Sequence, residues 1–394
     1  MRMLLTADKL VNGTSVLDFP VVEIQDGRIA SIDSRTAGGE LPAASGIELL
    51  DFPGATLAPA FFDVHIHGGA GHDAMEATPQ ALTAMGRLLA SHGTGSYLAT
   101  TVTAPLDATL RSLEGLGKLI AHPPGAEQSV AWPIGIHLEG PFLSHAKRGV
   151  HPPELLLAPD IRVFDRLYEA AEGHVRLMTL APELPGALEL AAHATAHGVR
   201  VSLGHSNATA AETRAGIAAG AVSATHTFNA MRTLDHREPG ILGVVLTTDS
   251  LFAELICDGI HTAPEMVKIW WRSKGPERAL LVTDAMSAAG MPDGEYSLAG
   301  LKIQVANGKA SFGDVLAGSV LTLDRALTNF LAFAGASLQD GLRLLTANPA
   351  AMTGFADMTG ALAVGRAANL VAVDGAGRLL ASFVNGRLAG PAGQ

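Results

Sequence analysis

Short apolar runs alternate with amphipathic stretches through the middle of the chain. Eight runs have the length and composition of buried β-strands: 60–64, 95–100, 133–138, 175–180, 199–203, 221–224, 252–256 and 279–282. Helical patterns separate most of them, for example at 78–91, 208–218 and 263–274. Eight strands that alternate with helices predict an α/β fold, a TIM-like (β/α)8 barrel. The alternative, an open doubly wound sheet, is disfavoured because no Gly-rich nucleotide fingerprint follows the early strands.

Both ends of the chain show short strands and turns instead. The apolar runs lie at 3–7, 21–24, 29–32, 369–373 and 382–384. Asp26-Gly27 and Asp374-Gly375 stand beside them, and Asp-Gly between apolar runs is a strong hairpin signal. Since the termini of a domain often lie close together, we expect one small β-sandwich domain built from both ends. The predicted division is 1–56 with 358–394 for this domain and 57–357 for the catalytic barrel.

Composition narrows the class of protein. The chain has 394 residues and only 16% are charged, which is typical of a compact globular protein. It has no apolar stretch of the roughly 18 residues that span a bilayer and no signal-peptide core near its start. We therefore expect a soluble, cytoplasmic protein with no membrane partner. A net charge of −11 without any basic run argues against a nucleic-acid partner.

The same composition limits the metal chemistry. Cys257 is the single cysteine, so an intrachain disulfide and a cysteine-rich metal site are excluded. The 15 histidines, several beside apolar runs, mean that any metal site would use imidazoles and carboxylates.

Polar residues recur where the predicted strands end. His65 and His67 follow the first strand and, being two residues apart, can face the same side. Glu139 ends the strand at 133–138, where a buried carboxylate needs a cation or hydrogen-bond donors. His137 shares its face, and we expect it to pack behind the site. Taken alone, each group has a structural alternative: core histidines for the pair, and a salt bridge or helix cap for Glu139.

Three later strands end in the same way. His205 follows the strand at 199–203, His226 follows 221–224 and Asp284 follows 279–282. In a barrel these ends converge on one mouth, so the residues meet despite their distance in sequence. An acid there can take a proton from metal-bound water and return it to a leaving group. Together these residues predict a metallohydrolase site.

The chain resembles the amidohydrolase superfamily and, within it, the N-acetylglucosamine-6-phosphate deacetylases. The resemblance covers nearly the whole chain and is carried by residues 59–68, 137–141, 203–206, 225–231, 237–240, 258–261 and 282–286. It implies hydrolysis of N-acetyl-D-glucosamine 6-phosphate to D-glucosamine 6-phosphate and acetate, in amino-sugar metabolism.

The resemblance also implies roles for individual residues. Glu139, His205 and His226 would ligate the main divalent metal, zinc or iron. His65 and His67 would hold a second ion bridged by Glu139, which gives one or two ions per subunit. Asp284 would act as general base and then acid, and His261 would polarise the acetyl carbonyl. The sugar-phosphate site would comprise Val150, His151, Asn229, Ala230, Arg237, His261, Leu316, Ala317 and Gly318.

Family members are commonly dimers in which the equivalent of Arg237 reaches a neighbour's substrate, so a homodimer or higher homo-oligomer is expected. The remaining alternatives are a deacetylase for N-acetylgalactosamine 6-phosphate, another amidohydrolase such as a dihydroorotase or D-amino-acid deacylase, and a non-catalytic sugar-phosphate-binding barrel. His145 and Lys147 are left without a role.

Overall fold

The computed structural model describes residues 2–37, 39 and 46–389. Its centre is a sheet of eight parallel strands that follow one another in chain order. They are β6 (Phe61–Ile66), β9 (Thr94–Thr100), β10 (Trp132–Glu139), β11 (Val175–Leu180), β12 (Arg200–Leu203), β13 (Ala221–Ala224), β14 (Phe252–Ile256) and β15 (Ala279–Val282). Beyond β15, Asp284 N donates to His65 O and His67 N donates to Ala285 O, so β15 returns to β6. The predicted barrel is confirmed, and all eight predicted strands are present.

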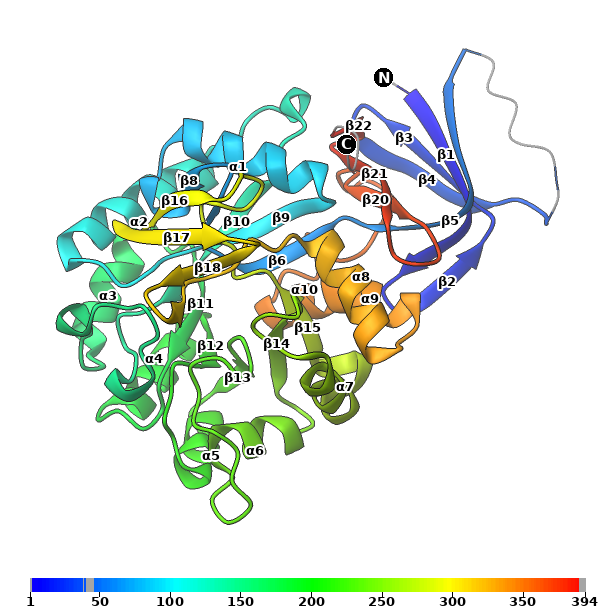
Figure 1. Ribbon diagram of the computed structural model, residues 1–394. Helices are drawn as coiled ribbons and strands as arrows, with labels where there is room; N and C mark the ends of the chain where they lie inside the picture. The colour runs from blue at the N-terminus through cyan, green and yellow to red at the C-terminus, as the bar shows by residue number, and fades with distance from the viewer. Residues whose placement is uncertain (1, 38, 40–45, 390–394) are drawn as a thin grey trace.

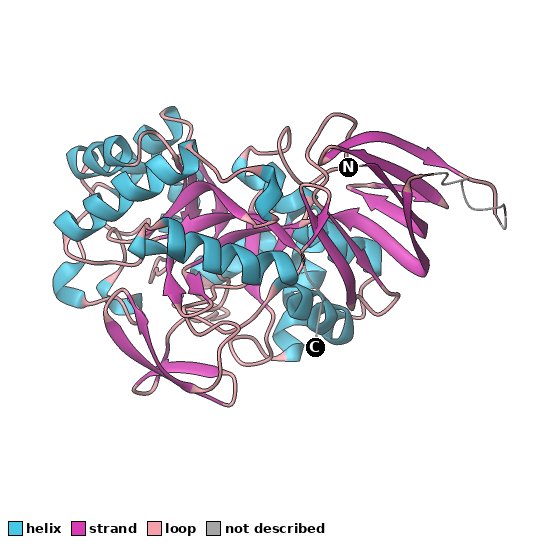
Figure 2. Cartoon of the chain, turned by 90° about the horizontal axis from the view of Figure 1, so that it is seen from above, coloured by secondary structure: helices cyan, strands magenta, loops and turns pink. Residues whose placement is uncertain are grey.

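Helices surround the barrel strands (Figures 1 and 2). They are α1 (Pro79–Ser91), α2 (Leu106–Ala121), α3 (Ile161–Ala170), α4 (Ala187–Ala196), α5 (Ala210–Ala218), α6 (Gly240–Thr247), α7 (Pro264–Arg278), α8 (Leu323–Ala334), α9 (Leu338–Leu345) and α10 (Ala347–Thr353). The predicted helix at 263–274 corresponds to α7, which continues past a break at Gly275. The break is expected there because Pro276 disfavours a helical conformation in the preceding residue.

A separate sheet is formed from both ends of the chain (Figure 1). Its order is β22-β21-β20-β5-β1-β3-β4, with β2 beside β1. The strands are β1 (Arg2–Asn12), β2 (Ser15–Asp18), β3 (Pro20–Gln25), β4 (Arg28–Ser34), β5 (Glu48–Pro59), β20 (Leu370–Val373), β21 (Leu379–Val384) and β22 (Arg387–Leu388). Ile29 N donates to Arg366 O and Ala368 N donates to Gly27 O, so the sheet curls back on itself. The small β domain from both termini is thus confirmed, with one continuous sheet around its own core.

Strand β5 connects this sheet to the barrel. Its first part pairs with β1, its last residues pair with β20, and Phe61 of β6 follows almost directly. This strand is not evident from the sequence because Pro53 and Gly54 interrupt its apolar pattern. The boundary between residues 56 and 57 falls within β5, and the division into 1–56 with 358–394 and 57–357 stays a prediction.

An antiparallel sheet follows β15 and was not predicted. It comprises β16 (Gly294–Leu298), β17 (Leu301–Ala306), β18 (Lys309–Phe312) and β19 (Val315–Leu316). Asn307-Gly308 makes the turn between β17 and β18, and this dipeptide is a strong hairpin signal that the sequence reading did not use. Seen from above, the sheet stands apart from the barrel strands (Figure 2), and its last strand brings residues 316–318 to the barrel mouth.

The remaining short elements are β7 (Gly68–Gly69), β8 (His72–Asp73) and the 3-10 turns Ala74–Glu76, Ala126–Gln128, His145–Lys147 and Pro153–Leu155. No helix in the described part of the chain is both long and apolar enough to cross a membrane.

Candidate active site

A cavity of about 350 Å³ opens where the barrel strands end. It is lined by candidate residues from several strand ends, among them His67, Glu139, His205, His226 and Asp284. Because the carboxyl ends of barrel strands share one mouth, residues more than two hundred positions apart meet here. The five predicted strand-end segments therefore converge as the sequence analysis expected.

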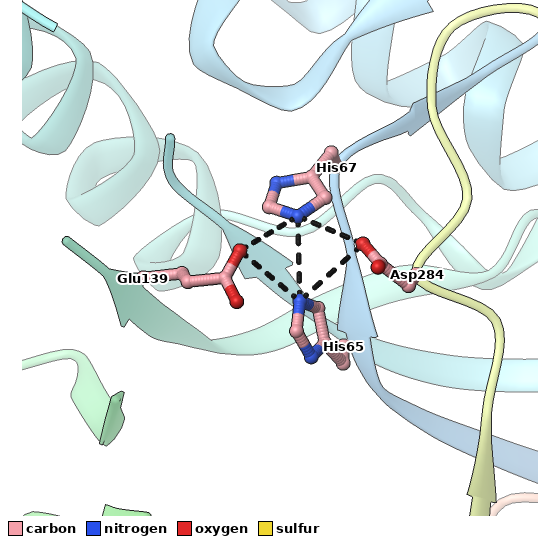
Figure 3. Close-up of side chains that lie close together, drawn as sticks. All are labelled: His65, His67, Glu139 and Asp284. Atoms are coloured by element: carbon pink, nitrogen blue, oxygen red, sulfur yellow. Dashed lines mark hydrogen bonds and ion pairs between the residues drawn. The ribbon is translucent and has the colours of Figure 1, made fainter. Parts of the chain in front are cut away.

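His65, in β6, and His67, just after the end of β6, both face two carboxylates (Figure 3). The Nε2 atoms of the two imidazoles are 3.3 Å apart. His67 Nε2 lies 3.1 Å from Glu139 Oε2 and 3.1 Å from Asp284 Oδ1. The corresponding distances from His65 Nε2 are 3.4 and 3.5 Å. Four candidate ligand atoms thus surround one small volume.

The second oxygen of Glu139 faces two other imidazoles. Glu139 Oε1 lies 3.2 Å from His205 Nε2 and 3.1 Å from His226 Nε2. The two Nε2 atoms are themselves 3.1 Å apart. Glu139 therefore stands between two groups of histidines, with one carboxylate oxygen turned to each.

Hydrogen bonds to the outer ring nitrogens show that this donor set suits a cation. His205 Nδ1 lies 2.9 Å from Lys147 O, and a carbonyl can only accept, so Nδ1 carries the proton and Nε2 presents a lone pair. His65 Nδ1 makes the same kind of contact with the Glu254 carboxylate at 3.2 Å. Lone pairs and carboxylate oxygens that converge at about 3 Å repel one another unless a positive charge lies among them. Imidazole with carboxylate is a donor set that zinc and iron accept.

Electrostatics keep the acids of this cluster ionised. Burial would raise the pKa of Glu139, but the neighbouring imidazoles of His65, His205 and His226 hold it well below its usual range. Burial also opposes charge on His67, yet hydrogen bonds to Asp284 and Glu139 outweigh it and raise the pKa of this imidazole to about 9. The cluster thus carries the negative charge that draws in a proton or a metal cation.

Three of the strand-end residues have strained backbones. His205, His226 and Asp284 have φ angles of 46°, 27° and 49°, which non-glycine residues seldom adopt. Such conformations cost on the order of 1–3 kcal/mol each and persist where the surroundings impose them. The turns aim the three side chains into the cavity instead of letting each strand continue.

His261 reaches the cavity from the loop after β14. Its Nδ1 lies 2.7 Å from Asp258 Oδ2, and its backbone N–H donates to Asp258 Oδ1. Burial would raise the pKa of Asp258, but its contacts with His261 lower it. The ionised carboxylate holds the proton on Nδ1, so the orientation of the His261 ring is fixed from behind.

The predicted sugar-phosphate residues divide into three groups. Six of them line the cavity together with His261: Val150, His151, Asn229, Ala230, Leu316 and Gly318. Ala317 is fully buried behind this wall. Arg237 is exposed on the loop after Met231 and does not line the cavity of its own chain. Within the described residues its guanidinium makes no hydrogen bond or ion pair, so a surface pair with Asp235 or Glu238 is not formed.

His151 lies closer to the metal-type cluster than its predicted role required. Its Nε2 is 3.8 Å from Glu139 Oε2, and its Nδ1 is 2.8 Å from Thr103 Oγ1. Burial lowers the pKa of His151 to about 3. The ring is therefore neutral near pH 7 and offers a hydrogen bond rather than a charge. His137 contacts Thr179 Oγ1 at 2.8 Å and lies behind the cavity.

Two residues near the cavity were missed. Lys147, for which the sequence predicts no role, lines it. Glu254 on β14 is fully buried and contacts His65. Its signal was present in the sequence, since an acid within the apolar run 252–256 has the same burial cost that singled out Glu139.

Comparison with known proteins identifies the family. The model of the family described as "Amidohydrolase family" matches residues 56–390. The chain belongs to the amidohydrolase family. An N-acetylgalactosamine-6-phosphate deacetylase from Escherichia coli O157:H7 is 37% identical over 99% of this chain and 100% of the relative. An N-acetylglucosamine-6-phosphate deacetylase from Lysinibacillus sphaericus is 36% identical over 90% of this amidohydrolase and 89% of the relative.

Solved structures agree with this assignment. A mutant N-acetyl-D-glucosamine-6-phosphate deacetylase from Mycobacterium smegmatis, in complex with N-acetyl-D-glucosamine-6-phosphate, superposes with a TM-score of 0.90. It is 36% identical, and the match covers 98% of this amidohydrolase and 99% of that chain. The corresponding enzyme from Thermotoga maritima is 31% identical, with a TM-score of 0.86 over 99% and 100% of the two chains.

Proposed function

We propose that this amidohydrolase hydrolyses N-acetyl-D-glucosamine 6-phosphate to D-glucosamine 6-phosphate and acetate. The observation that carries the proposal is the cluster in which Glu139 turns one oxygen to His205 and His226 and the other to His65 and His67. Full-length similarity to deacetylases of amino-sugar phosphates supports the choice of substrate.

The proposed ligands follow from the two halves of the cluster. Glu139, His205 and His226 would hold the principal ion, zinc or iron, and His65 and His67 would hold a second one. A bound divalent ion lowers the pKa of its water and polarises a carbonyl, which is the chemistry that amide hydrolysis needs.

The protein's own residues supply the proton transfers. Asp284, on the cavity wall, accepts a proton from the attacking water while the oxygen–carbon bond forms at the acetyl group. It then delivers that proton to the sugar nitrogen as the carbon–nitrogen bond breaks, which releases acetate and the amine. In its imidazolium form, with Asp258 accepting from Nδ1, His261 would donate from Nε2 to the acetyl oxygen, and one such donor is worth roughly 3–4 kcal/mol.

Recognition of the phosphate is assigned to a second subunit. Arg237 is exposed and unpaired within the described chain, and its planar fork suits two phosphate oxygens. We propose a homodimer in which Arg237 of each subunit reaches the substrate of the other. His151 and the Val150 backbone would complete the site from within the subunit, and Lys147 is near enough to contribute charge.

We also propose a cytoplasmic location. The single cysteine of the chain, Cys257, is buried and forms no disulfide, which agrees with a reducing compartment.

A second candidate substrate has its own support. The relative from Escherichia coli O157:H7 is named for N-acetylgalactosamine 6-phosphate and is 37% identical over essentially the whole chain. The two sugars differ at one hydroxyl, and the wall formed by Leu316 and Gly318 would have to distinguish them.

The test is acetate release from both phosphorylated sugars and from unphosphorylated N-acetylglucosamine, with metal content measured on the same sample. We expect the highest kcat/KM for N-acetylglucosamine 6-phosphate, loss on chelation and recovery with zinc or iron. A higher kcat/KM for the galactosamine isomer would select the second candidate. Tight binding of the sugar phosphates without acetate release would support the remaining alternative, a barrel that binds sugar phosphates without catalysis.

A further inference from the structure

Glu254 is a buried acid that the proposed reaction does not use. It lies in the middle of β14 and is fully buried. Within the described chain no lysine or arginine pairs with it, and its Oε1 atom is buried without a hydrogen-bond partner. Burial of an acid with so few partners costs several kcal/mol, whereas an apolar residue would pack a barrel interior without that cost. A structural role alone does not account for Glu254.

The other carboxylate oxygen reaches both halves of the metal-type cluster. Glu254 Oε2 lies 3.2 Å from His65 Nδ1 and 3.2 Å from the backbone N of His226. A carboxylate accepts, so it holds the proton of His65 on Nδ1 and leaves the Nε2 lone pair facing Glu139 and Asp284. Carboxylates placed behind imidazoles in this way orient metal-ligating histidines and strengthen them as ligands.

The same residue fixes the turn at His226. The φ angle of His226 is 27°, an unfavourable conformation for a side-chain-bearing residue. Glu254 supports this turn twice, because its side chain accepts from His226 N and its backbone carbonyl accepts from Thr227 N. The direction in which His226 Nε2 points toward Glu139 depends on this turn.

Asp63 provides a contrast. It too is a buried acid close to His65, but its carboxylate accepts from Thr283 Oγ1 at 2.6 Å and from the backbone N of His65 at 3.2 Å. These contacts hold the strands β6 and β15 together and involve no ring nitrogen. Glu254 differs because its side-chain partner is the imidazole itself.

We propose that Glu254 is a positioning residue that orients His65 and His226 from behind and thereby sets the affinity of the cluster for divalent cations. The inference rests on the proposed function, since it assumes that these histidines ligate a metal.

The experiment is a zinc titration of the full-length protein against a chromophoric chelator. Glu254→Gln keeps an oxygen that can accept both hydrogen bonds but loses the charge, and Glu254→Met loses the acceptor as well. We expect a fall in zinc affinity of about 10-fold for Glu254→Gln and up to about 100-fold for Glu254→Met. Asp324→Asn is the matched control, because Asp324 pairs with His92 Nδ1 at 3.0 Å outside the cavity. This control should bind zinc as the wild type does.

A double-mutant cycle separates positioning from general destabilisation. If Glu254 acts through His65, Glu254→Gln should change zinc affinity less in a His65→Gln background than in the wild type. Equal zinc affinity of Glu254→Gln and wild type would overturn the inference and leave the proposed function intact. A wild-type protein that binds no zinc or iron would overturn the proposed function itself. If Glu254→Met does not fold, the zinc affinity of Glu254→Gln alone tests the inference.

Discussion

At the scale of single residues, Asp284 is the group on which the proposed chemistry depends most. It lies two residues after the end of β15, has a φ angle of 49°, and its Oδ1 is 3.1 Å from His67 Nε2. Asp284→Asn keeps the size of the side chain but removes its capacity to accept a proton. We expect kcat to fall by about 10²- to 10⁴-fold, the usual contribution of a general base. Acetate release measures the effect, and zinc content checks that the cluster is still loaded. A rate within twofold of wild type would refute the assigned role.

Arg237 is the residue whose role depends on a second subunit. Because it is exposed and outside the cavity of its own chain, Arg237→Ala should leave folding unchanged. Loss of a bidentate phosphate contact should raise KM for the phosphorylated sugar at least about 10-fold. Activity on the unphosphorylated sugar should not change. Arg162→Ala, which removes an exposed arginine from α3, is the matched control. An unchanged KM for the phosphorylated sugar would exclude Arg237 from the phosphate site.

The sequence predicted side chains at strand ends better than side chains within strands. His205 and Asp284 stand where an apolar run stops, so the topology of a barrel alone brings them together. Glu254 lies inside a run, and only the register of β14 shows which ring it touches. Likewise, nothing in the sequence placed His151 within 3.8 Å of Glu139, because a loop carries it there.

At the scale of elements, regular packing was predictable and irregular connections were not. The strands at 175–180, 221–224, 252–256 and 279–282 have the predicted bounds because each is a short, mostly apolar run whose residues are nearly all buried. Strand β5 and the sheet β16–β19 were missed, since their apolar positions are interrupted by proline and glycine or alternate with exposed polar residues. The sheet β16–β19 nevertheless supplies Leu316, in β19, to the cavity.

The packing of α7 against α6 gives a prediction for pH. Lys274 Nζ donates to Val245 O and Thr248 O at the end of α6. Burial lowers the pKa of this lysine from 10.5 to about 8, although Asp249 opposes the shift. Between these two pH values the unfolded chain binds more protons than the folded one, so loss of the proton favours folding. The stability of wild type relative to Lys274→Met should therefore rise as the pH increases from about 8 to about 10.5.

Urea unfolding of both proteins at pH 7, 9 and 10.5 measures this difference. The comparison with Lys274→Met cancels the titration of all other groups that both proteins share. A stability difference that stays constant, or that falls with increasing pH, would contradict the expected shift of Lys274.

At the scale of the whole molecule, two apolar cores meet through β5. One core fills the barrel and its helices, and the other lies within the curled sheet around Leu5, Ile24 and Phe383. The candidate metal ligands all belong to the barrel and come from residues as far apart as His65 and Asp284. A cation bound there would be held by residues at the ends of the first and last barrel strands, β6 and β15, and would stabilise their contact.

Metal binding should therefore stabilise the barrel by mass action. At a free zinc concentration 100 times the Kd, the gain is about 2.7 kcal/mol, which corresponds to roughly 5–10 °C in Tm for a large domain. We expect chelation to lower the apparent Tm by that amount at a fixed scan rate and zinc to restore it. Leu5→Ala should lower the Tm by opening a cavity in the small sheet, yet show the same chelator-dependent shift, because distant sites contribute additively. A Tm that does not respond to chelation would mean that the convergent histidines and carboxylates do not hold a cation. Something other than a metal would then have to offset the repulsion among their lone pairs.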